Sequence, residues 1–400
     1  MPMDAFRKPG LWTPVGTDMV WRRQRLFTPG PTPIPDRVQE AMAAPLVYHR
    51  GPDFPAFLTH LIRDLKLVLP TTDDTFLLSC SGTGAMEAGI VNCLSHGDRV
   101  IVVSAGQFGE KWVDLCRAYG TDVKVLDFPW GEPADPSRLE KALHQYPDTK
   151  AVLATHSETS TGVMHDIEAL GRIVGKTDAL FLVDGISSVV AHALPTTKWG
   201  VDIAVTASQK GLMLPPGLAA ITISDRAWEA AGRSDLPRAY LDLGRYRNAL
   251  SEGRGPATLP VTLMAGLRAS LDMILEQGME AIWQQHEIQA RAVRGAAQAL
   301  GLSCFAASPS NALTSIGLPE EIDGLALMES MRTDFGVVVG GGLGDLRGKI
   351  IRISNLGYVD DLDALTAVSA LEMGLQKIGW QFQAGAGVGA AEGIIGEGKQ

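Results

Sequence analysis

The sequence predicts an α/β fold: a large domain with a mainly parallel, seven-stranded sheet between helices, and a small α+β C-terminal domain. Between about residues 75 and 225, short apolar runs alternate with helical stretches. The runs are apolar almost throughout, which is typical of parallel strands covered on both faces. After about residue 265 the pattern changes to a long helical region, 279–300, followed by further strands and helices. The expected strands of the large sheet are 75–79, 99–104, 123–128, 151–156, 180–184, 202–208 and 218–224.

This pattern divides the chain into four expected parts: an N-terminal arm (1–26), a large domain (27–270), a small domain (271–380) and a C-terminal tail (381–400). In the arm, Pro9, Pro14 and the charged residues 22–25 interrupt any periodic pattern, and arms of this kind often pack on a partner subunit. The tail is rich in glycine and alanine and has no periodic apolar face. We therefore expect the tail to be poorly ordered and flexible.

Composition excludes several classes of protein. The 400 residues are 46% hydrophobic and 20% charged, as in a globular enzyme with more than one lobe. A net charge of -10 gives no overall positive field for nucleic acid or an anionic membrane. We expect no membrane span and no signal peptide, because no long apolar stretch is present. The four cysteines have no CxxC pair or ligand-like spacing, which predicts a cytoplasmic protein without a metal site.

Two charged side chains stand at the ends of neighbouring apolar runs. Asp184 closes the run 180–184, and Lys210 follows the run 202–208 and precedes the rigid turn Pro215-Pro216-Gly217. An amine and a carboxylate in this arrangement are what a pyridoxal phosphate (PLP) enzyme needs, one to form a Schiff base and one to keep the ring nitrogen protonated. Two simpler alternatives remain: a solvated surface lysine, and an aspartate that caps the helix after it.

A phosphate site is predicted where Ser81-Gly82-Thr83-Gly84 opens a helix after the first strand. Free backbone N–H groups and the positive end of the helix dipole would hold a phosphate there. A dinucleotide fingerprint starting at Gly82 would need a glycine at position 87, where Glu87 stands. The alternative for this segment is an ordinary strand-to-helix turn.

Taken together, these motifs resemble the class V, fold-type I, PLP-dependent aminotransferases. Within that family the chain is most similar to the serine–glyoxylate and alanine–glyoxylate aminotransferases. The resemblance runs from about residue 27 to about residue 375, nearly the whole chain. It is carried by Ser81-Gly82-Thr83, Asp184-Gly185-Ile186-Ser187-Ser188, the segment 208–217, and Arg352-Ile353-Ser354.

The resemblance implies a role for each cofactor-binding residue. Lys210 would form the Schiff base and Asp184 would pair with the pyridine nitrogen. Phe108 would stack on the ring, although a phenylalanine of the core has the same sequence pattern. The expected set also includes residues for the phosphate and the ring hydroxyl, and one that reaches across a homodimer interface so that the two active sites are shared: Ser81, Gly82, Thr83, Gln209, Thr159, Ile186 and Thr258.

The same resemblance implies the substrate-binding residues. Arg352 would grip the α-carboxylate with its planar fork, whereas the alternative is an ordinary surface ion pair. The turn around Gly30 would help to orient the substrate. His49 and Arg50 would either line the side-chain pocket or lie in an interface. Relatives often have a tyrosine where this chain has Ala257 or Gly255, which weakens the case for a phosphate contact from the partner chain.

These residues predict an aminotransferase that uses a small L-amino acid, with serine favoured, and glyoxylate. Alanine and aspartate remain alternative donors, because the three differ only beyond Cβ. A cysteine desulfurase-like lyase would need a reactive cysteine on a mobile loop of the small domain. Cys304 is the only cysteine there, in an apolar run 302–307 that is typical of a core strand. A non-catalytic subunit is disfavoured by the presence of Lys210, Asp184 and Arg352.

Overall fold

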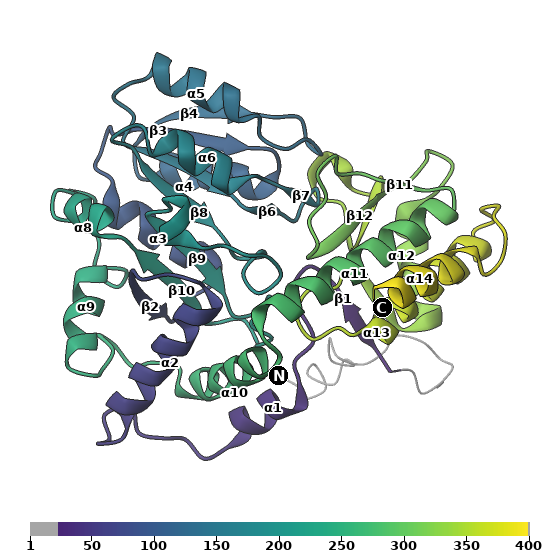
Figure 1. Cartoon of the computed structure of the whole chain (residues 1–400), viewed down its shortest axis with the longest axis horizontal. Helices are drawn as coiled ribbons and strands as arrows, with labels where there is room; N and C mark the ends of the chain where they lie inside the picture. Colours follow the sequence, from purple (N-terminus) through teal and green to yellow (C-terminus); the bar gives the residue numbers. More distant parts are fainter. Residues whose placement is uncertain (1–22, 399–400) are drawn as a thin grey trace, which may run out of the picture.

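The computed structural model describes residues 23–398 and has two lobes joined by one long helix (Figure 1). The lobe formed by the first two thirds of the chain contains the large sheet, and the other contains a smaller sheet with the C-terminal helices. The joining helix is α11 (Met279–Ala299). Its first residues, Met279 and Ile282, lie in a core cluster of the large lobe, and Ala292 to Ala297 lie in the core of the small lobe.

The large sheet has the seven strands predicted from the sequence. They are arranged in the order β2-β10-β9-β8-β5-β3-β4, and only β10 runs antiparallel to its neighbours. Four of these strands, β5, β8, β9 and β10, are buried along their whole length, which explains their continuous apolar sequence. In this order the strands are β2 (Asp74–Leu78), β10 (Ala219–Ile223), β9 (Ile203–Ala207), β8 (Leu180–Asp184), β5 (Ala151–Thr155), β3 (Arg99–Ser104) and β4 (Asp122–Asp127).

Helices cover both faces of this sheet. Along β3, Ile101 and Val103 join one core cluster while Val100 and Val102 join the other, so alternate side chains serve opposite faces. The first cluster includes α2 (Phe54–Val68), α5 (Pro136–Gln145), α6 (Ile167–Val174) and α10 (Val261–Gln277). The second includes α3 (Gly82–Cys93), α4 (Gln107–Ala118), α8 (Asp225–Ala231) and α9 (Leu243–Ser251). The remaining elements of this lobe are α1 (Asp36–Ala43), α7 (Thr196–Trp199) and the hairpin of β6 (Ser157–Glu158) and β7 (Val163–Met164).

The small lobe is built on a five-stranded sheet with the order β1-β13-β14-β12-β11. The predicted strand near 349–354 and the predicted helix from residue 361 are both present, as β14 and α13. The strands are β1 (Arg25–Phe27), β13 (Val337–Gly341), β14 (Ile350–Ser354), β12 (Leu313–Gly317) and β11 (Ser303–Cys304). The helices are α12 (Gly324–Phe335), the short 3-10 helix η2 (Gly344–Leu346), α13 (Asp361–Lys377) and α14 (Ala386–Glu397).

The expected boundaries of the lobes differ from the structure in two places. Residues 25 and 26 of the expected arm and residue 27 of the expected large domain form β1, which pairs with β13, so this stretch belongs to the small sheet. The rest of the expected arm falls largely outside the described residues. The expected border at residue 270 lies inside α10, whose side chains pack in the large lobe. The expected core strand around Cys304 is also shorter than predicted, and Cys304 is half-buried.

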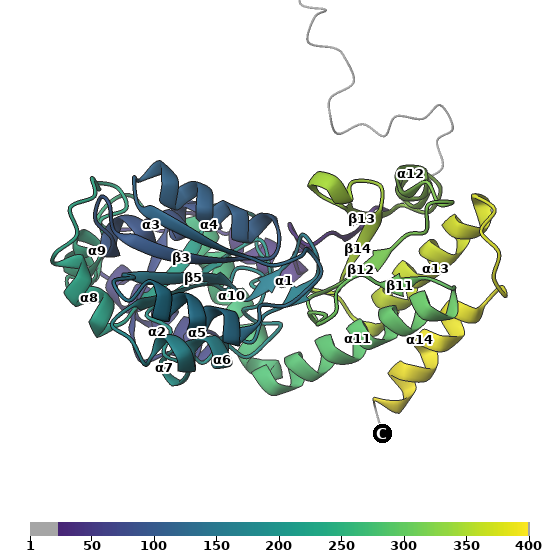
Figure 2. The same ribbon diagram turned by 90° about the horizontal axis from the view of Figure 1, so that it is seen from above.

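The prediction of a poorly ordered tail is wrong for residues 386–397, which form α14. Figure 2 shows α14 lying beside α11, and Ala391 and Ile395 are buried in the small-lobe core. The carboxylate of Glu372 accepts backbone hydrogen bonds from Gly387 (3.1 Å) and Val388 (3.2 Å), which caps the helix. The small residues of α14 let it approach α11 closely, so α14 packs against the small lobe although its sequence has no apolar stripe.

Among residues 23–398, no helix combines the length and the apolar character that crossing a bilayer would require.

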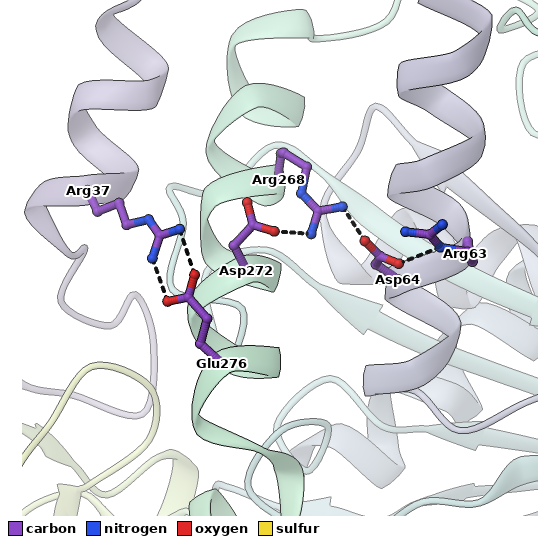
Figure 3. A network of polar contacts seen from close by, with 6 residues as sticks. All are labelled: Arg37, Arg63, Asp64, Arg268, Asp272 and Glu276. Atoms are coloured by element: carbon purple, nitrogen blue, oxygen red, sulfur yellow. Dashed lines mark hydrogen bonds and ion pairs between the residues drawn. The ribbon is translucent and has the colours of Figure 1, made fainter.

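A network of charged side chains fastens α10 to α1 and α2 (Figure 3). Arg37 of α1 forms a bidentate pair with Glu276 of α10, at 2.7 and 2.9 Å. Asp64 of α2 is almost fully buried and accepts hydrogen bonds from Arg63 and from Arg268 of α10. The hydrogen bond from Arg63 is the main reason why the pKa of Asp64 is lowered. Helix α10 also supports the loop after residue 210. The charged network on α1, α2 and α10 is therefore connected to that loop.

We predict that Asp64→Asn lowers the free energy of unfolding by about 1–3 kcal/mol, because Arg268 loses a buried charged partner. Because the pKa of Asp64 is lowered in the folded protein, its contribution to the free energy of unfolding is complete above pH 3.8. The contribution is lost as the pH falls below that value. Urea denaturation at pH 7 and pH 3 measures both effects. Glu276→Gln is the matched control; its pair with Arg37 is solvent-exposed, and an equal loss in that variant would contradict the role of burial.

Candidate active site

Lys210 and Asp184 lie at the carboxyl ends of two adjacent parallel strands. Asp184 is the last residue of β8, which pairs with β9, and Lys210 follows β9 by three residues. Both side chains line one cavity of about 320 Å³ at this edge of the sheet. Lys210 is 9% exposed and Asp184 is 3% exposed, so Lys210 is not the solvated surface lysine of the simpler alternative. Asp184 does accept the backbone N–H of Ile186 at 2.8 Å, as a capping residue would, and it also faces the cavity.

Burial shifts the pKa values of the two groups in opposite directions. Loss of solvent lowers the pKa of Lys210 from 10.5 to about 8, although the nearby Asp184 carboxylate opposes this shift. Loss of solvent raises the pKa of Asp184 from 3.8 to about 7, while the backbone N–H of Ile186, at 2.8 Å, favours the anion. The amine is therefore available as a nucleophile near neutral pH.

The loop 28–32 holds the lysine from above. The ammonium of Lys210 donates to the carbonyl oxygen of Pro29, and the hydroxyl of Thr32 donates to the carbonyl oxygen of Lys210 at 2.9 Å. Gly30 has a φ of +136°, and a Cβ atom at this position would lie 2.7 Å from the Lys210 nitrogen. Only glycine fits this close approach, which places Gly30 in the cavity as predicted.

The residues predicted to bind a phosphate lie together at the start of α3. Ser81, Gly82 and Thr83 all line the cavity, and Ser81 makes no side-chain capping bond to its own helix. A Cβ on Gly82 would lie 2.4 Å from Ile186 Cδ1, so this backbone can approach a ligand only without a side chain. Gln209 also lines the cavity, and its amide NH₂ is a donor that a phosphate could use. This donor-rich, small-residue corner fits the phosphate of PLP.

Phe108 and Ile186 contribute the apolar part of the cavity wall. Phe108 is the second residue of α4 and is half-buried, so it faces the cavity and is not a residue of the sealed core. Ile186 lies two residues after Asp184. An aromatic ring, an apolar side chain and a carboxylate arranged around one cavity suit a flat pyridine ring.

Arg352 comes to the site from the small lobe. Its side chain is 7% exposed; Nε donates to the carbonyl oxygen of Gly341 at 2.8 Å, and Nη1 donates to the carbonyl oxygen of Thr159. Burial lowers the pKa of Arg352 from 12.5 to about 10, and the charge of Glu158 opposes this shift. The positive charge of Arg352 also contributes to lowering the pKa of Lys210. The predicted surface ion pair is not observed for Arg352, which is buried.

Arg352 does not itself line the cavity, and neither do four other predicted site residues of the same chain. Thr159 is buried beside it and contributes its carbonyl to Arg352. His49, Arg50 and Thr258 lie on the loops 44–53 and 252–260, where Arg50 and Thr258 are exposed. The role expected for Thr258 needs a second chain and stays a prediction.

Several residues at the site were not predicted from the sequence. Glu158 is fully buried and binds the start of α4, where its Oε2 accepts the backbone N–H groups of Phe108 and Gly109, both at 3.0 Å. The available signal was a carboxylate three residues after the end of the buried strand β5. Other lining residues are Met86, Lys111, Ser157, Ser187, Pro31 and Pro216. Across residues 23–398, no three His, Cys, Asp or Glu side chains gather in a way that could hold a metal ion.

A two-lobed fold with a mainly parallel seven-stranded sheet, and with a buried lysine and a buried aspartate facing one cavity, is the arrangement of a fold-type I, PLP-dependent aminotransferase. The family model for class V aminotransferases matches residues 26–343. The chain therefore belongs to the class V aminotransferase family.

Individual relatives cover nearly the whole chain. A protein named soluble hydrogenase, small subunit, of a Synechococcus species is 41% identical over 92% of this chain and 98% of its own length. L-aspartate–glyoxylate aminotransferase of Paracoccus denitrificans is 39% identical over 92% and 95%. Serine–glyoxylate aminotransferase of Methylorubrum extorquens is 37% identical over 99% and 98%. The crystal structure of ureidoglycine–glyoxylate aminotransferase from Bacillus subtilis superposes with a TM-score of 0.90 at 26% identity, over 95% of this chain and all of that chain.

We predict that Lys210 of the apoprotein becomes reactive at an unusually low pH. Reductive methylation needs the unprotonated amine, and the fraction of that form rises as the pH passes through about 8. Unburied lysines reach the same point near pH 10.4. Peptide mass spectrometry across pH 6–11 measures the midpoint for the peptide that contains Lys210. A midpoint above 10 would show that the amine is not desolvated, and PLP-loaded protein is the protected control.

Proposed function

We propose that this protein transfers the amino group of a small L-amino acid, with serine favoured, to glyoxylate, giving a 2-oxo acid and glycine. The observation that carries the proposal is the single cavity that combines Lys210, Asp184 and the start of α3. Relatives named for glyoxylate as acceptor and for serine or aspartate as donor support the class of substrates. Alanine and aspartate remain the alternative donors.

PLP, when bound, supplies an aldehyde that binds amines and an electron-poor ring that accepts the electrons of the α C–H bond. Lys210 would hold the cofactor through its nitrogen and then carry the proton removed from the substrate. Its pKa of about 8 suits both tasks, because a base is most useful when its pKa is near the working pH. Asp184 would keep a proton on the ring nitrogen, and burial strengthens that interaction.

The remaining residues bind and orient. The N–H groups at the start of α3 and the Ser81 and Thr83 side chains would hold the phosphate, while Phe108 would stack on the ring. Arg352 would bind the α-carboxylate, which sets the α C–H bond perpendicular to the ring plane. We further propose that His49 and Arg50 border the substrate side chain.

The lyase alternative has little support in the structure. The half-buried Cys304 belongs to β11, and it does not line the cavity that holds Lys210. The four cysteines are free, which supports our proposal of a cytoplasmic location.

The principal test is a comparison of amino donors in a half-reaction. The PLP-loaded protein should be yellow, and its absorbance band should disappear on mixing with a donor, most readily with serine. Lys210→Ala should lower turnover by about 10³-fold or more, because it removes the proton carrier. Stopped-flow absorbance with serine, alanine and aspartate gives the donor order. A variant at Lys210 with unimpaired turnover would refute the mechanism, and a faster reaction with aspartate would correct the donor.

We propose a homodimer in which each site is completed by Thr258 of the other chain. The loop before His49 exposes three large apolar side chains, Leu46 (76%), Val47 (57%) and Tyr48 (64%). Such a patch is unusual on a monomer and typical of an interface. Thr258 lies on an exposed loop and makes no contact with the cavity of its own chain.

Hybrid dimers test this arrangement. We expect Thr258→Ala to weaken PLP binding about tenfold, which corresponds to the loss of one hydrogen bond to a charged group. A hybrid with Lys210→Ala has one site with both residues intact, so at a PLP concentration too low to load the Thr258→Ala sites, mixing the two variants should restore activity above that of either variant alone. Light scattering gives the assembly state. A fully active monomer, or hybrids without restored activity, would contradict shared sites.

A further inference from the structure

The helix that presents Phe108 lacks a cap of its own. Gly106 stands at the N-cap position of α4 and has no side chain to accept hydrogen bonds from the first turn. The free N–H groups there need acceptors from elsewhere. The segment 158–160 provides them: Gln107 N–H donates to the hydroxyl of Ser160 at 3.0 Å, and the next two N–H groups donate to Glu158 Oε2.

Glu158 is fixed by hydrogen bonds at both carboxylate oxygens. Oε1 accepts the backbone N–H of Ser160 at 3.1 Å and the Ser160 hydroxyl at 2.5 Å. Within residues 23–398 it forms no direct ion pair with an arginine or lysine. Backbone dipoles and the positive end of α4 compensate its charge, together with the nearby Arg352, whose pKa the Glu158 charge raises. A Cβ on Gly106 would lie 2.6 Å from the Glu158 carboxyl carbon, so glycine is required for this contact.

The same short segment also reaches the small lobe. Thr159, between the two capping residues, accepts the hydrogen bond from Arg352 Nη1. Segment 158–160 is therefore in contact with the helix that carries Phe108 and with the arginine from β14. One buried carboxylate fixes the segment on which both depend.

We propose that Glu158 is a positioning residue for this reaction: it fixes Phe108 against the cofactor ring and, through the Thr159 backbone, Arg352 at the substrate carboxylate. This inference rests on the proposed function and assigns a role to a residue that touches neither cofactor nor substrate. A glutamine at this position would keep one acceptor oxygen but turn an amide NH₂ toward backbone N–H groups. The first turn of α4 would then lose its fixed place.

A matched control is available at the amino end of β9, at the end of the strands opposite the cavity. Asp202 is 3% exposed and accepts a backbone N–H from Phe181 at 2.9 Å and the hydroxyl of Ser224 at 2.7 Å. It resembles Glu158 in burial and in accepting a backbone N–H and a serine hydroxyl, and it has in addition an ion pair with Arg226 at 3.7 Å. Asp202 directly precedes β9, so it lies far from the carboxyl ends of the strands, where the cavity is. Asp202→Asn therefore reports what the loss of a buried carboxylate does to stability alone.

The test compares Glu158→Gln with Asp202→Asn in three measurements. In the apoprotein, hydrogen exchange of the peptide covering residues 105–112 should become faster only in E158Q. The PLP dissociation constant and the KM for the amino donor should both rise about tenfold in E158Q and stay near wild type in D202N, as expected for about 1.4 kcal/mol each. Combining E158Q with Phe108→Leu should add little to the weakening of PLP binding, because both changes act on one contact.

A second variant covers the case in which E158Q does not fold. Ser160→Ala removes the hydroxyl that accepts from Gln107 and donates to Glu158, and it should shift the same three measurements in the same direction by smaller factors. E158Q or S160A with wild-type PLP affinity, KM and exchange would overturn the inference. If the wild type neither binds PLP nor transaminates, the proposed function fails instead, and the exchange data still decide whether Glu158 fixes α4.

Discussion

The site depends on two opposite charges held in one cavity from which water is largely excluded. Burying either charge alone would cost free energy. Burial therefore shifts both pKa values in the direction that favours the neutral form of each group. The parallel pairing of β8 and β9 makes the arrangement possible, because their carboxyl ends meet at one edge. The covering helices and the loop over the lysine leave the side chains of Lys210 and Asp184 only 9% and 3% exposed to solvent. A base with an adjusted pKa is the result of that exclusion.

The lobes meet at a few polar contacts near this edge, and the contacts are specific. Arg352 crosses from the small sheet to a backbone carbonyl of the large lobe. On the other side of the cavity, Thr32 and Pro29 bind the lysine segment. Ser270 of α10 donates to the carbonyl oxygen of Leu212 at 2.6 Å, so the segment after the lysine is also fastened from below. Hydrogen bonds thus hold the groups proposed to bind substrate and cofactor in fixed positions relative to one another, although these groups come from distant parts of the chain.

Much of the fold and of the candidate site could be predicted from the sequence, because buried parallel strands appear as continuous apolar runs. The seven strands appeared as apolar runs, and Lys210, Asp184, Ser81 and Gly82 followed from motifs next to strand ends. Phe108 was implied by the family resemblance. Glu158 could not be predicted in the same way. Its partners are some fifty residues distant, and only the fold shows that α4 has no cap of its own. The tail was misjudged for a related reason: glycine and alanine have no apolar stripe, yet they pack when a neighbouring helix such as α11 provides the surface.

Strand β1 gives the chain an unusual path at its start. Residues 25–27 run along the edge of the small sheet, paired in parallel with β13, and within a few residues the chain passes over the lysine and enters the large lobe. Pro29 fits against Gly340 of β13, where a Cβ would lie 2.8 Å from its ring. The segment between Phe27 and Thr32 is therefore a short tether anchored at both ends. Any rotation of one lobe against the other must be taken up in this tether, directly above the amine that the enzyme uses.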